Sequence, residues 1–183
     1  SNNNCQPRRP PSSISHIIKQ GNMMSSSTSI LCWNCNGWDS SKLHQFQQLD
    51  SLPDIIALTE THHTTRNPPY TPIPSHPFRL FNTYVVPKTI TDRIQEGGVA
   101  LISRYPLTSL TTITGTCKDA LFAKTRFINT RGQPTRGVIG VVYRRYRASA
   151  ANDILYQAMQ RAIDYCTRHS LPLLIVGDLN ARH

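Results

Sequence analysis

The chain has 183 residues, of which 20 are Lys or Arg and 10 are Asp or Glu, so its formal net charge is +10. This length suits one domain with a sizeable core, and no apolar run reaches the roughly 20 residues of a membrane-spanning helix, which excludes a transmembrane protein. No apolar signal segment precedes Ile30. We therefore expect an intracellular protein, with the nucleus as a candidate compartment and with reduced thiols at its five cysteines.

The N-terminal part of the chain differs in composition from the rest. Residues 1–29 are rich in Asn, Pro and Ser, contain no acidic residue and offer little apolar surface to bury. Such a composition is typical of a disordered segment. We predict a disordered leader at 1–29 and one folded domain at 30–183.

The domain begins with a strand, a helix and a second strand. Ile30–Trp33 is a short apolar run before an Asn-Gly turn, which predicts a buried strand. Asp39 or Ser40 can cap a helix that a proline ends. Asp54–Glu60 is apolar except at its polar end and predicts a second buried strand. The prolines between residues 62 and 78 indicate a loop.

The rest of the domain contains a run of strands, a helix and a last strand. The strand candidates are Phe78–Val86, Gly98–Ser103, Leu107–Ile113, Leu121–Ile128 and Val138–Tyr143. Asn152 or Asp153 opens a helix that ends near Arg168 and carries an apolar face. Leu171–Gly177 then predicts another buried strand. This mixture predicts an α/β or α+β fold with more than one sheet.

Three of the predicted buried strands end in polar residues that an apolar strand does not need. These ends are Asn34-Cys35-Asn36, Thr59-Glu60 and Asp178-Leu179-Asn180. Residues two apart on an extended chain point to the same side, so Asn34 can act with Asn36 and Asp178 with Asn180. The oxygens of Glu60, Asn36 and Asp178 are ligands that suit Mg²⁺. Any one pair alone favours ordinary turn and cap roles, whereas all three together favour a functional site.

Positive charge is concentrated in one segment. Lys118–Arg147 contains eight Lys or Arg residues and a single acidic residue, Asp119, which favours a polyanionic partner; a solvated surface is the alternative. We predict that five of these residues contact nucleic acid, with DNA as the expected form: Lys124 and Arg126, which share one face of a strand, and Arg144, Arg145 and Arg147, which follow Tyr143.

The spacing of Cys32 and Cys35 also needs an interpretation. A structural zinc site needs four ligands, and the sequence has no second C-x-x-C pair. We therefore expect both cysteines to be small buried residues.

Five segments in register resemble the endonuclease/exonuclease/phosphatase superfamily. They are Trp33–Gly37 (W-N-x-N-G), Ile56–His62 (L-Q-E-T), Gly97–Ser103 (G-G-V-A), Val141–Tyr143 and Gly177–Asn180 (G-D-x-N). Each motif alone is weak, but the five occur in the order and at the separations of that superfamily. Within it, the E-T-H and G-D-x-N-A-x-H forms resemble the endonuclease domain of non-LTR, LINE-type retrotransposons.

The resemblance implies a fold and an activity. The fold is a four-layer sandwich of two packed β-sheets flanked by helices, and the activity is Mg²⁺- or Mn²⁺-dependent cleavage of a phosphodiester or phosphomonoester. By position, Glu60 is the implied metal ligand, with Asn36 assisting, and Asn34 orients the phosphate or the metal shell. Asp178 positions or deprotonates the attacking water, and Asn180 hydrogen-bonds the developing negative charge. Tyr143 contacts the phosphate or the nucleophile, or it packs on its neighbours instead.

The sequence departs from the superfamily pattern at its end. The last superfamily motif, Ser-Asp-His, does not occur, and we expect the last strands of the second sheet to be missing from this C-terminally truncated domain. The leading expectation is a metal-dependent, DNA-nicking endonuclease domain from a retrotransposon-type polyprotein that also carries a reverse transcriptase. The alternatives are a catalytically inactive nucleic-acid-binding fragment and a phosphatase or phosphodiesterase that acts on another phosphate ester.

Overall fold

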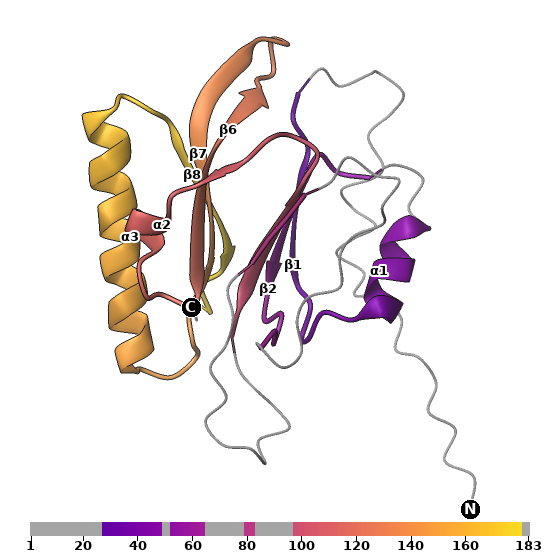
Figure 1. The fold of residues 1–183 in the computed structure, drawn as a ribbon, viewed down its shortest axis with the longest axis vertical. Coiled ribbons are helices and arrows are strands. Elements are labelled where there is room, and N and C mark those ends of the chain that lie inside the picture. Colours follow the sequence, from indigo (N-terminus) through magenta and orange to yellow (C-terminus); the bar gives the residue numbers. More distant parts are fainter. Residues whose placement is uncertain (1–26, 49–51, 65–78, 83–96, 181–183) are drawn as a thin grey trace, which may run out of the picture.

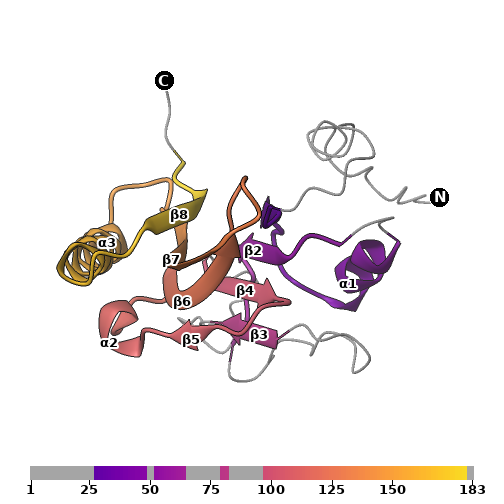
Figure 2. The same ribbon diagram turned by 90° about the horizontal axis from the view of Figure 1, so that it is seen from above.

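The computed structural model describes residues 27–48, 52–64, 79–82 and 97–180, which form two β-sheets packed face to face with a helix on each outer side (Figure 1). The layers run from helix α3 through the second sheet and the first sheet to helix α1. Figure 2 shows the same order from above. The expected α/β fold with two packed sheets and flanking helices is confirmed. Within the described residues, no helix is long and apolar enough to cross a membrane.

The first sheet has the strand order β1-β2-β4-β3. Its strands are β1 (Ile30–Asn34), β2 (Ile55–Thr59), β4 (Val99–Ser103) and β3 (Arg79–Asn82). Strands β1 and β2 are parallel, with α1 (Ser40–Gln47) in the connection, and β4 is antiparallel to both β2 and β3. Oδ1 of Asp39 accepts a hydrogen bond from the backbone N–H of Lys42 at 3.0 Å, so Asp39 is the cap of α1.

The second sheet has the order β5-β6-β7-β8. Its strands are β5 (Thr108–Ser109), β6 (Ala120–Ile128), β7 (Pro134–Tyr143) and β8 (Leu173–Asp178). A long hairpin joins β6 to β7, and β8 pairs parallel to β7 after the crossover through α3 (Ala150–Arg168). The parallel pairs in both sheets send several strand ends to the same edge of the molecule.

Two layers of apolar side chains hold the sheets and α3 together. Between the sheets, alternate residues of β2 and β4 pack against alternate residues of β6 and β7: Ile55, Ala57, Val99, Leu101, Leu121, Ala123, Ile139 and Val141. The outer face of the second sheet packs on the predicted apolar face of α3, formed by Leu155, Ala158, Ala162 and Cys166. These alternations follow from the two-residue period of strands and the 3.6-residue period of a helix.

The prediction of a strand over Leu107–Ile113 is wrong for most of that segment. Only Thr108–Ser109 forms a strand, and a short helix, α2 (Thr111–Thr114), follows. Leu110 and Ile113 are three residues apart, and a helical turn lets both enter the core beneath α3. Tertiary packing therefore overrides the strand preference of this Thr- and Ile-rich sequence.

The prediction that the first and last strands are buried is also wrong. Cys32 and Asn34 on β1 are exposed, and so is Leu174 on β8. Among the described residues, β1 pairs only with β2, and β8 only with β7. An apolar sequence alone does not distinguish a central strand from an edge strand.

The predicted leader lies outside the described residues up to residue 26. Its last residues contact the fold, since the backbone N–H of Thr28 donates to the carbonyl of Ile128 at 2.8 Å and Ser29 donates to the carboxylate of Asp54 at 2.9 Å. Contact with the domain therefore begins before residue 30. Most of the proline-rich loop, at 65–78, and most of the strand predicted over Phe78–Val86, apart from residues 79–82, also fall outside the described residues.

Candidate functional site

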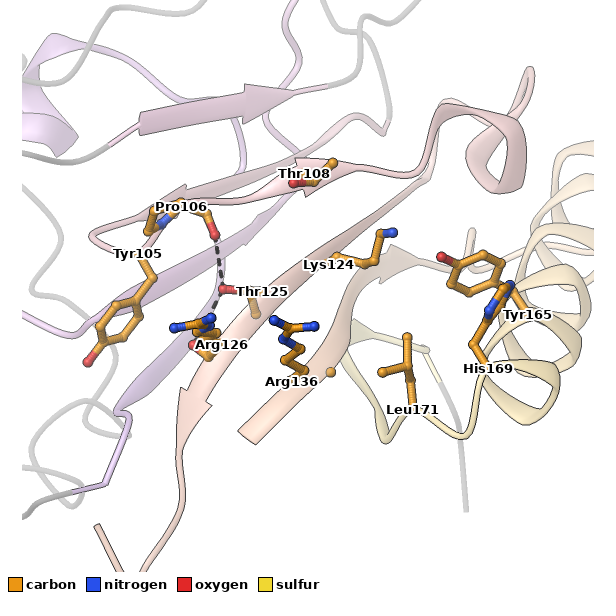
Figure 3. A pocket seen from close by; sticks show the side chains of 11 residues that line it. Tyr105, Pro106, Thr108, Lys124, Thr125, Arg126, Arg136, Tyr165, His169 and Leu171 are labelled. Carbon is orange, nitrogen blue, oxygen red and sulfur yellow. Dashed lines mark hydrogen bonds between the residues drawn. The ribbon is translucent and has the colours of Figure 1, made fainter. Parts of the chain in front are cut away.

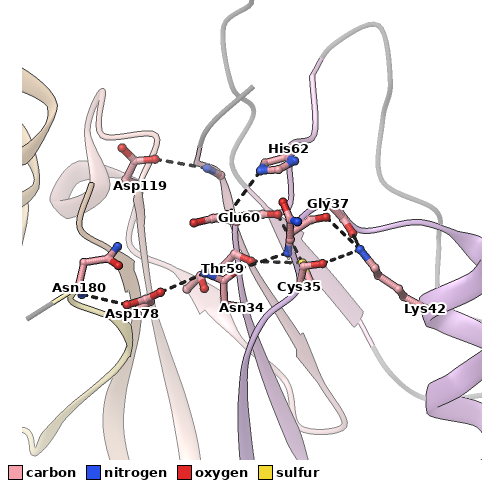
Figure 4. A network of polar contacts seen from close by, with 12 residues as sticks. Asn34, Cys35, Gly37, Lys42, Thr59, Glu60, His62, Asp119, Asp178 and Asn180 are labelled. Atoms are coloured by element: carbon pink, nitrogen blue, oxygen red, sulfur yellow. Dashed lines mark hydrogen bonds and ion pairs between the residues drawn. The ribbon is translucent and has the colours of Figure 1, made fainter. Parts of the chain in front are cut away.

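The polar strand ends of the two sheets meet at one edge of the molecule (Figure 4). The side-chain Nδ2 of Asn34, at the end of β1, donates a hydrogen bond to Oδ2 of Asp178, at the end of β8, at 3.0 Å. Oδ1 of Asn34 accepts from the backbone N–H of Asn36 at 3.2 Å. One amide side chain thus links the two sheets and fixes the turn that follows β1.

The backbone at this edge is held in an unusual conformation. Asn36, Glu60, His62 and Asn180 all have positive φ angles, between 44° and 56°. Such angles are uncommon for residues with a side chain, and they gather at sites where the surrounding structure enforces them. The turns after β1 and β2 are joined by a hydrogen bond, which the N–H of Gly37 donates to the carbonyl of Glu60 at 2.6 Å.

A third support comes from the Gly-Gly pair that precedes β4. The N–H groups of Thr61 and His62 donate to the carbonyls of Gly98 and Gly97, both at 3.1 Å. Gly97 has a φ of 94°, and a Cβ at this position would clash with the carboxylate of Asp119. A residue without a side chain is required here, which gives the G-G motif a physical reason.

Lys42 stabilises the turn after β1 through its side-chain ammonium group. Its Nζ donates to the carbonyls of Cys35 at 2.5 Å and Asn36 at 3.0 Å, and also to that of Gly37. Three donors of one ammonium group therefore satisfy three consecutive carbonyls, which would otherwise repel one another across this tight turn. The side chain of Asn36 itself is exposed to solvent.

Glu60 and Asp178 are the acidic groups of this edge, together with the more deeply buried Asp119. The carboxylate of Glu60 lies 3.8 Å from Nε2 of His62 and is partly exposed. Asp178 is half-buried, and its Oδ1 accepts from the backbone N–H of Asn180 at 2.9 Å. Both carboxylates are thus oriented by neighbours while retaining access to solvent.

The donor set at this edge fits a hard divalent cation. Carboxylate and amide oxygens are the ligands Mg²⁺ prefers, and Mg²⁺ is usually held by one or two carboxylates together with water and substrate phosphate. Within the described residues there is no group of three or more His, Cys, Asp or Glu side chains that could hold a metal. The residues that could contribute to such a site are Glu60 and Asn36, as the sequence predicts.

Asn180 and Arg144 are locked together beside Asp178. Nδ2 of Asn180 donates to the carbonyl of Arg144 at 2.6 Å, and the guanidinium of Arg144 donates to the carbonyl of Asn180 at 3.3 Å. Nε of Arg144 also donates to the hydroxyl of Tyr156 at 2.7 Å. Arg144 therefore presents a fixed positive charge next to Asp178.

Tyr143 is placed at the end of β7 with its side chain turned into the space between the sheets. It is 5% exposed and belongs to the core cluster there. Its N–H donates to the carbonyl of Asp119 at 2.8 Å. This burial agrees with the packing alternative for Tyr143, and contact of its hydroxyl with a phosphate stays a prediction.

The five predicted nucleic-acid contacts divide into two groups. Arg144, Arg145 and Arg147 follow β7 at the edge that carries Asp178, but Nε of Arg145 is paired with the buried carboxylate of Asp119 at 2.9 Å. Lys124 and Arg126 are exposed on the outer face of β6, opposite Val138 and Arg136 in register. Arg136 and Tyr143 are seven positions apart on β7, which is about 23 Å of extended chain. Lys124 and Arg126 are thus far from the candidate site.

Cys32 on β1 and Cys35 just after it belong to no group of metal-ligating side chains among the described residues. Burial raises the pKa of the Cys35 thiol to about 12, and its Sγ donates to the carbonyl of Thr59 at 3.2 Å. Cys35 is buried as expected, whereas Cys32 is exposed, so the prediction of two buried residues is half wrong. All four described cysteines are free thiols.

Sequence reasoning missed three residues that build this edge: Lys42, Asp119 and Asn152. Asn152 or Asp153 was expected to open α3, but the helix begins at Ala150 after Ser149, so that prediction is wrong. Asn152 is instead buried and binds the arginine loop, accepting from the N–H of Arg145 at 3.0 Å and donating to the carbonyls of Arg145 and Arg147. A signal existed only for Asp119, the one acidic residue within a strongly basic segment.

Comparison with known proteins identifies the architecture. The sequence model of the Endonuclease/Exonuclease/phosphatase family matches residues 31–183. Among curated proteins, no sequence match to this chain is found.

Similar solved structures include the catalytic domain of Xenopus laevis APE2, with a TM-score of 0.61 and 19% identity over 85% of this chain and 59% of that one. A 3'-5' exonuclease, NExo, from Neisseria meningitidis has a TM-score of 0.57 and 20% identity over 84% of this chain and 58% of that one. A NExo variant, described as a 3' phosphatase bound to a product DNA hairpin, has a TM-score of 0.53 and 19% identity over the same shares. The chain therefore spans about three fifths of the length of these structures.

Proposed function

Because this chain belongs to the endonuclease/exonuclease/phosphatase family, we propose that it forms part of a divalent-metal-dependent phosphodiesterase that nicks DNA. The family name itself covers nucleases and phosphatases, which are hydrolases of phosphate esters. The finer proposal is an endonuclease domain of a retrotransposon-type polyprotein, acting in the nucleus. It is supported by the E-T-H-H sequence at residues 60–63 and by G-D-L-N-A-R-H at residues 177–183.

The observation that carries the proposal is the hydrogen bond between Asn34 and Asp178, 3.0 Å long. These residues are far apart in sequence and lie on different sheets, yet the contact brings a carboxylate and an amide to the edge that also carries Glu60. Packing of the core does not account for this hydrogen bond, because the side chains of Asn34 and Asp178 both lie at partly exposed strand ends. A phosphate ester docked at this edge would meet acidic, amide and cationic groups together.

Each side chain of this edge has a chemical role in the proposal. A divalent ion bound at Glu60 and Asn36 would neutralise charge on the scissile phosphate. Asp178, held by Asn34 and by the N–H of Asn180, orients an attacking water and accepts its proton. The amide of Asn34 and the guanidinium of Arg144 are positioned donors that stabilise the added negative charge in the transition state.

Charge and the similar structures support DNA as the substrate. The protein carries a net charge of +10, and the loop after β7 adds the exposed Arg147 and the half-buried Arg144 to the catalytic edge. Phosphate contacts of this kind provide most of the affinity of a protein for nucleic acid. One of the similar structures holds a product DNA hairpin.

The proposal is tested by incubating supercoiled plasmid DNA with the protein and Mg²⁺ and measuring the conversion to nicked circles. We expect Glu60→Gln and Asp178→Asn each to lower the nicking rate by roughly a hundredfold or more, since each removes a charge that acts in the transition state. The control is Asp164→Asn, which removes an exposed carboxylate on α3 that accepts a hydrogen bond from Gln160. Nicking that persists in both active-edge variants, or that does not depend on a divalent metal, would refute the proposal.

A further inference from the structure

A second basic site lies on the outer face of the second sheet (Figure 3). It is separate from the candidate active edge. We call it the distal basic pocket. It has a volume of about 740 Å³, within the range of sites for nucleotide-sized ligands. Its lining comes from the loop before β5, from β6 and β7 and from the end of α3, and includes Lys124, Arg126, Arg136, Tyr165 and His169.

The described residues of this pocket carry positive charge only. Lys124, Arg126 and Arg136 are exposed cations, and none of the described residues that line the pocket is acidic. Arg126 and Arg136 are directly opposite each other in the β6–β7 register. Like charges in directly opposite positions of a sheet destabilise it. An anion between the two guanidinium groups would remove this repulsion, and planar guanidinium groups suit phosphate oxygens well.

Aromatic rings lie beside these cations. The rings of Tyr165 and His169 are stacked at a tilt, with centroids 4.4 Å apart, and Nζ of Lys124 lies 5.9 Å from the centroid of the Tyr165 ring. Aromatic faces next to a row of cations are the arrangement with which proteins bind unpaired bases and the phosphates that join them. A free inorganic anion would use the cations alone.

The spacing of the cations favours a polymer. Lys124 and Arg126 are two residues apart on the same face of β6, so their backbones are about 7 Å apart, and Arg136 extends the row across the hairpin. We propose that the distal basic pocket binds a single strand of nucleic acid, with phosphates on Lys124, Arg126 and Arg136 and a base against Tyr165. This is a second binding site, about 23 Å of strand away from the active edge.

The first test measures binding of a fluorescent oligothymidylate of about ten nucleotides, a length that single-strand binders accommodate. A chelator is present, so that cleavage does not occur. We expect Arg126→Ala/Arg136→Ala to raise the dissociation constant about tenfold and to lower the slope of log affinity against log salt by about 1.4, as expected for two lost phosphate contacts. The control is Arg131→Ala/Arg168→Ala, which removes the same charge from exposed residues outside the pocket.

Equal loss of affinity in the two double variants would overturn the proposal, because binding would then follow net charge alone. Competition by polyglutamate as strong as competition by unlabelled oligothymidylate would overturn it too, in favour of an acidic protein partner. Thermal unfolding of both variants checks that they are folded.

The second test locates the strand by photo-crosslinking of an oligonucleotide that carries 5-iodouracil. Tyr165 is flanked by Arg161 and Arg168, so trypsin releases it in a peptide distinct from those with Tyr146 and Tyr156 near the active edge. We expect crosslinks in the Tyr165 peptide, and crosslinks confined to the other two would overturn the proposal. Neither test requires cleavage, so a protein that fails to nick DNA can still pass them, and a nuclease can fail them.

Discussion

Nε of Arg145 donates to Oδ2 of Asp119 at 2.9 Å, and this ion pair joins the arginine loop to the rest of the active edge. Asp119 is 3% exposed, and its other oxygen accepts from the N–H of Gly98 at 3.3 Å. Gly98 in turn holds the segment after Glu60. Arg145 therefore acts on the site through a chain of contacts, and its guanidinium is committed to the protein before any nucleic acid arrives.

We predict that Arg145→Met lowers the free energy of unfolding by about 3 kcal/mol, because removal of one partner leaves a buried charge without compensation. Urea denaturation measures this loss. The matched control is Arg147→Met, which removes an exposed arginine two residues away and should change stability by no more than about 0.5 kcal/mol. Similar losses of unfolding free energy in the two variants would show that the ion pair with Asp119 stabilises the protein no more than an exposed arginine does.

Asn152 holds the arginine loop through its buried side chain. It makes three hydrogen bonds to the backbone of Arg145 and Arg147. We predict that Asn152→Ala destabilises the protein by about 2 kcal/mol, since buried backbone groups lose their partners, and that it weakens DNA binding by freeing the loop. Asp153→Ala, one residue further on the exposed side of α3, is the control. Hydrogen exchange at residues 144–149 measures the loop directly, and unchanged protection there would contradict the assignment.

Lys42 positions the turn that carries Asn36. We predict that Lys42→Met lowers the rate of DNA nicking roughly ten- to a hundredfold while the Michaelis constant changes little, because a displaced ligand costs catalysis more than binding. Lys42→Arg should restore part of the rate, since a guanidinium can still donate to carbonyls. A merely structural role would instead lower stability in both variants without separating the two kinetic constants.

His63 gives a pH dependence to stability. The side chain is 1% exposed. Burial lowers its pKa from the ordinary value of 6.5, so the folded protein holds it neutral while the unfolded chain takes up a proton as the pH falls. The stability that depends on a neutral His63 is present above about pH 6.5 and is lost progressively as the pH falls below this value.

We therefore predict that the unfolding free energy of the protein falls as the pH drops below about 6.5, and that His63→Gln reduces this fall. Chemical denaturation at a series of pH values measures it. The control is His44→Gln, a change at an exposed histidine on α1. An identical pH slope in the protein and in His63→Gln would contradict the prediction.

The local pattern of the chain was enough to predict most of its elements. The strands predicted at Leu121–Ile128 and Val138–Tyr143 lie within β6 and β7, although β7 begins four residues earlier, at Pro134. The spacing of three and four that puts Leu155, Ala158 and Ala162 on one face of α3 is confirmed, because it depends only on near neighbours in sequence. The short helix at Thr111–Thr114 was missed because two core contacts decided it against a β-branched sequence. The exposure of β1 and β8 was missed because neighbours in a sheet are not neighbours in sequence.

For the candidate site, the sequence by itself determined which residue types stand at the strand ends: Asn34, Glu60 and Asp178 follow apolar runs and have no role in a core. Only the tertiary structure decided that Asn34 and Asp178 touch, that Arg145 is bound to Asp119, and that Lys124 and Arg126 lie at a separate pocket. The physical reason is that hydrophobic periodicity fixes which face of a strand is buried. The register and packing of two sheets, which arise from contacts between distant residues, fix which strand ends meet.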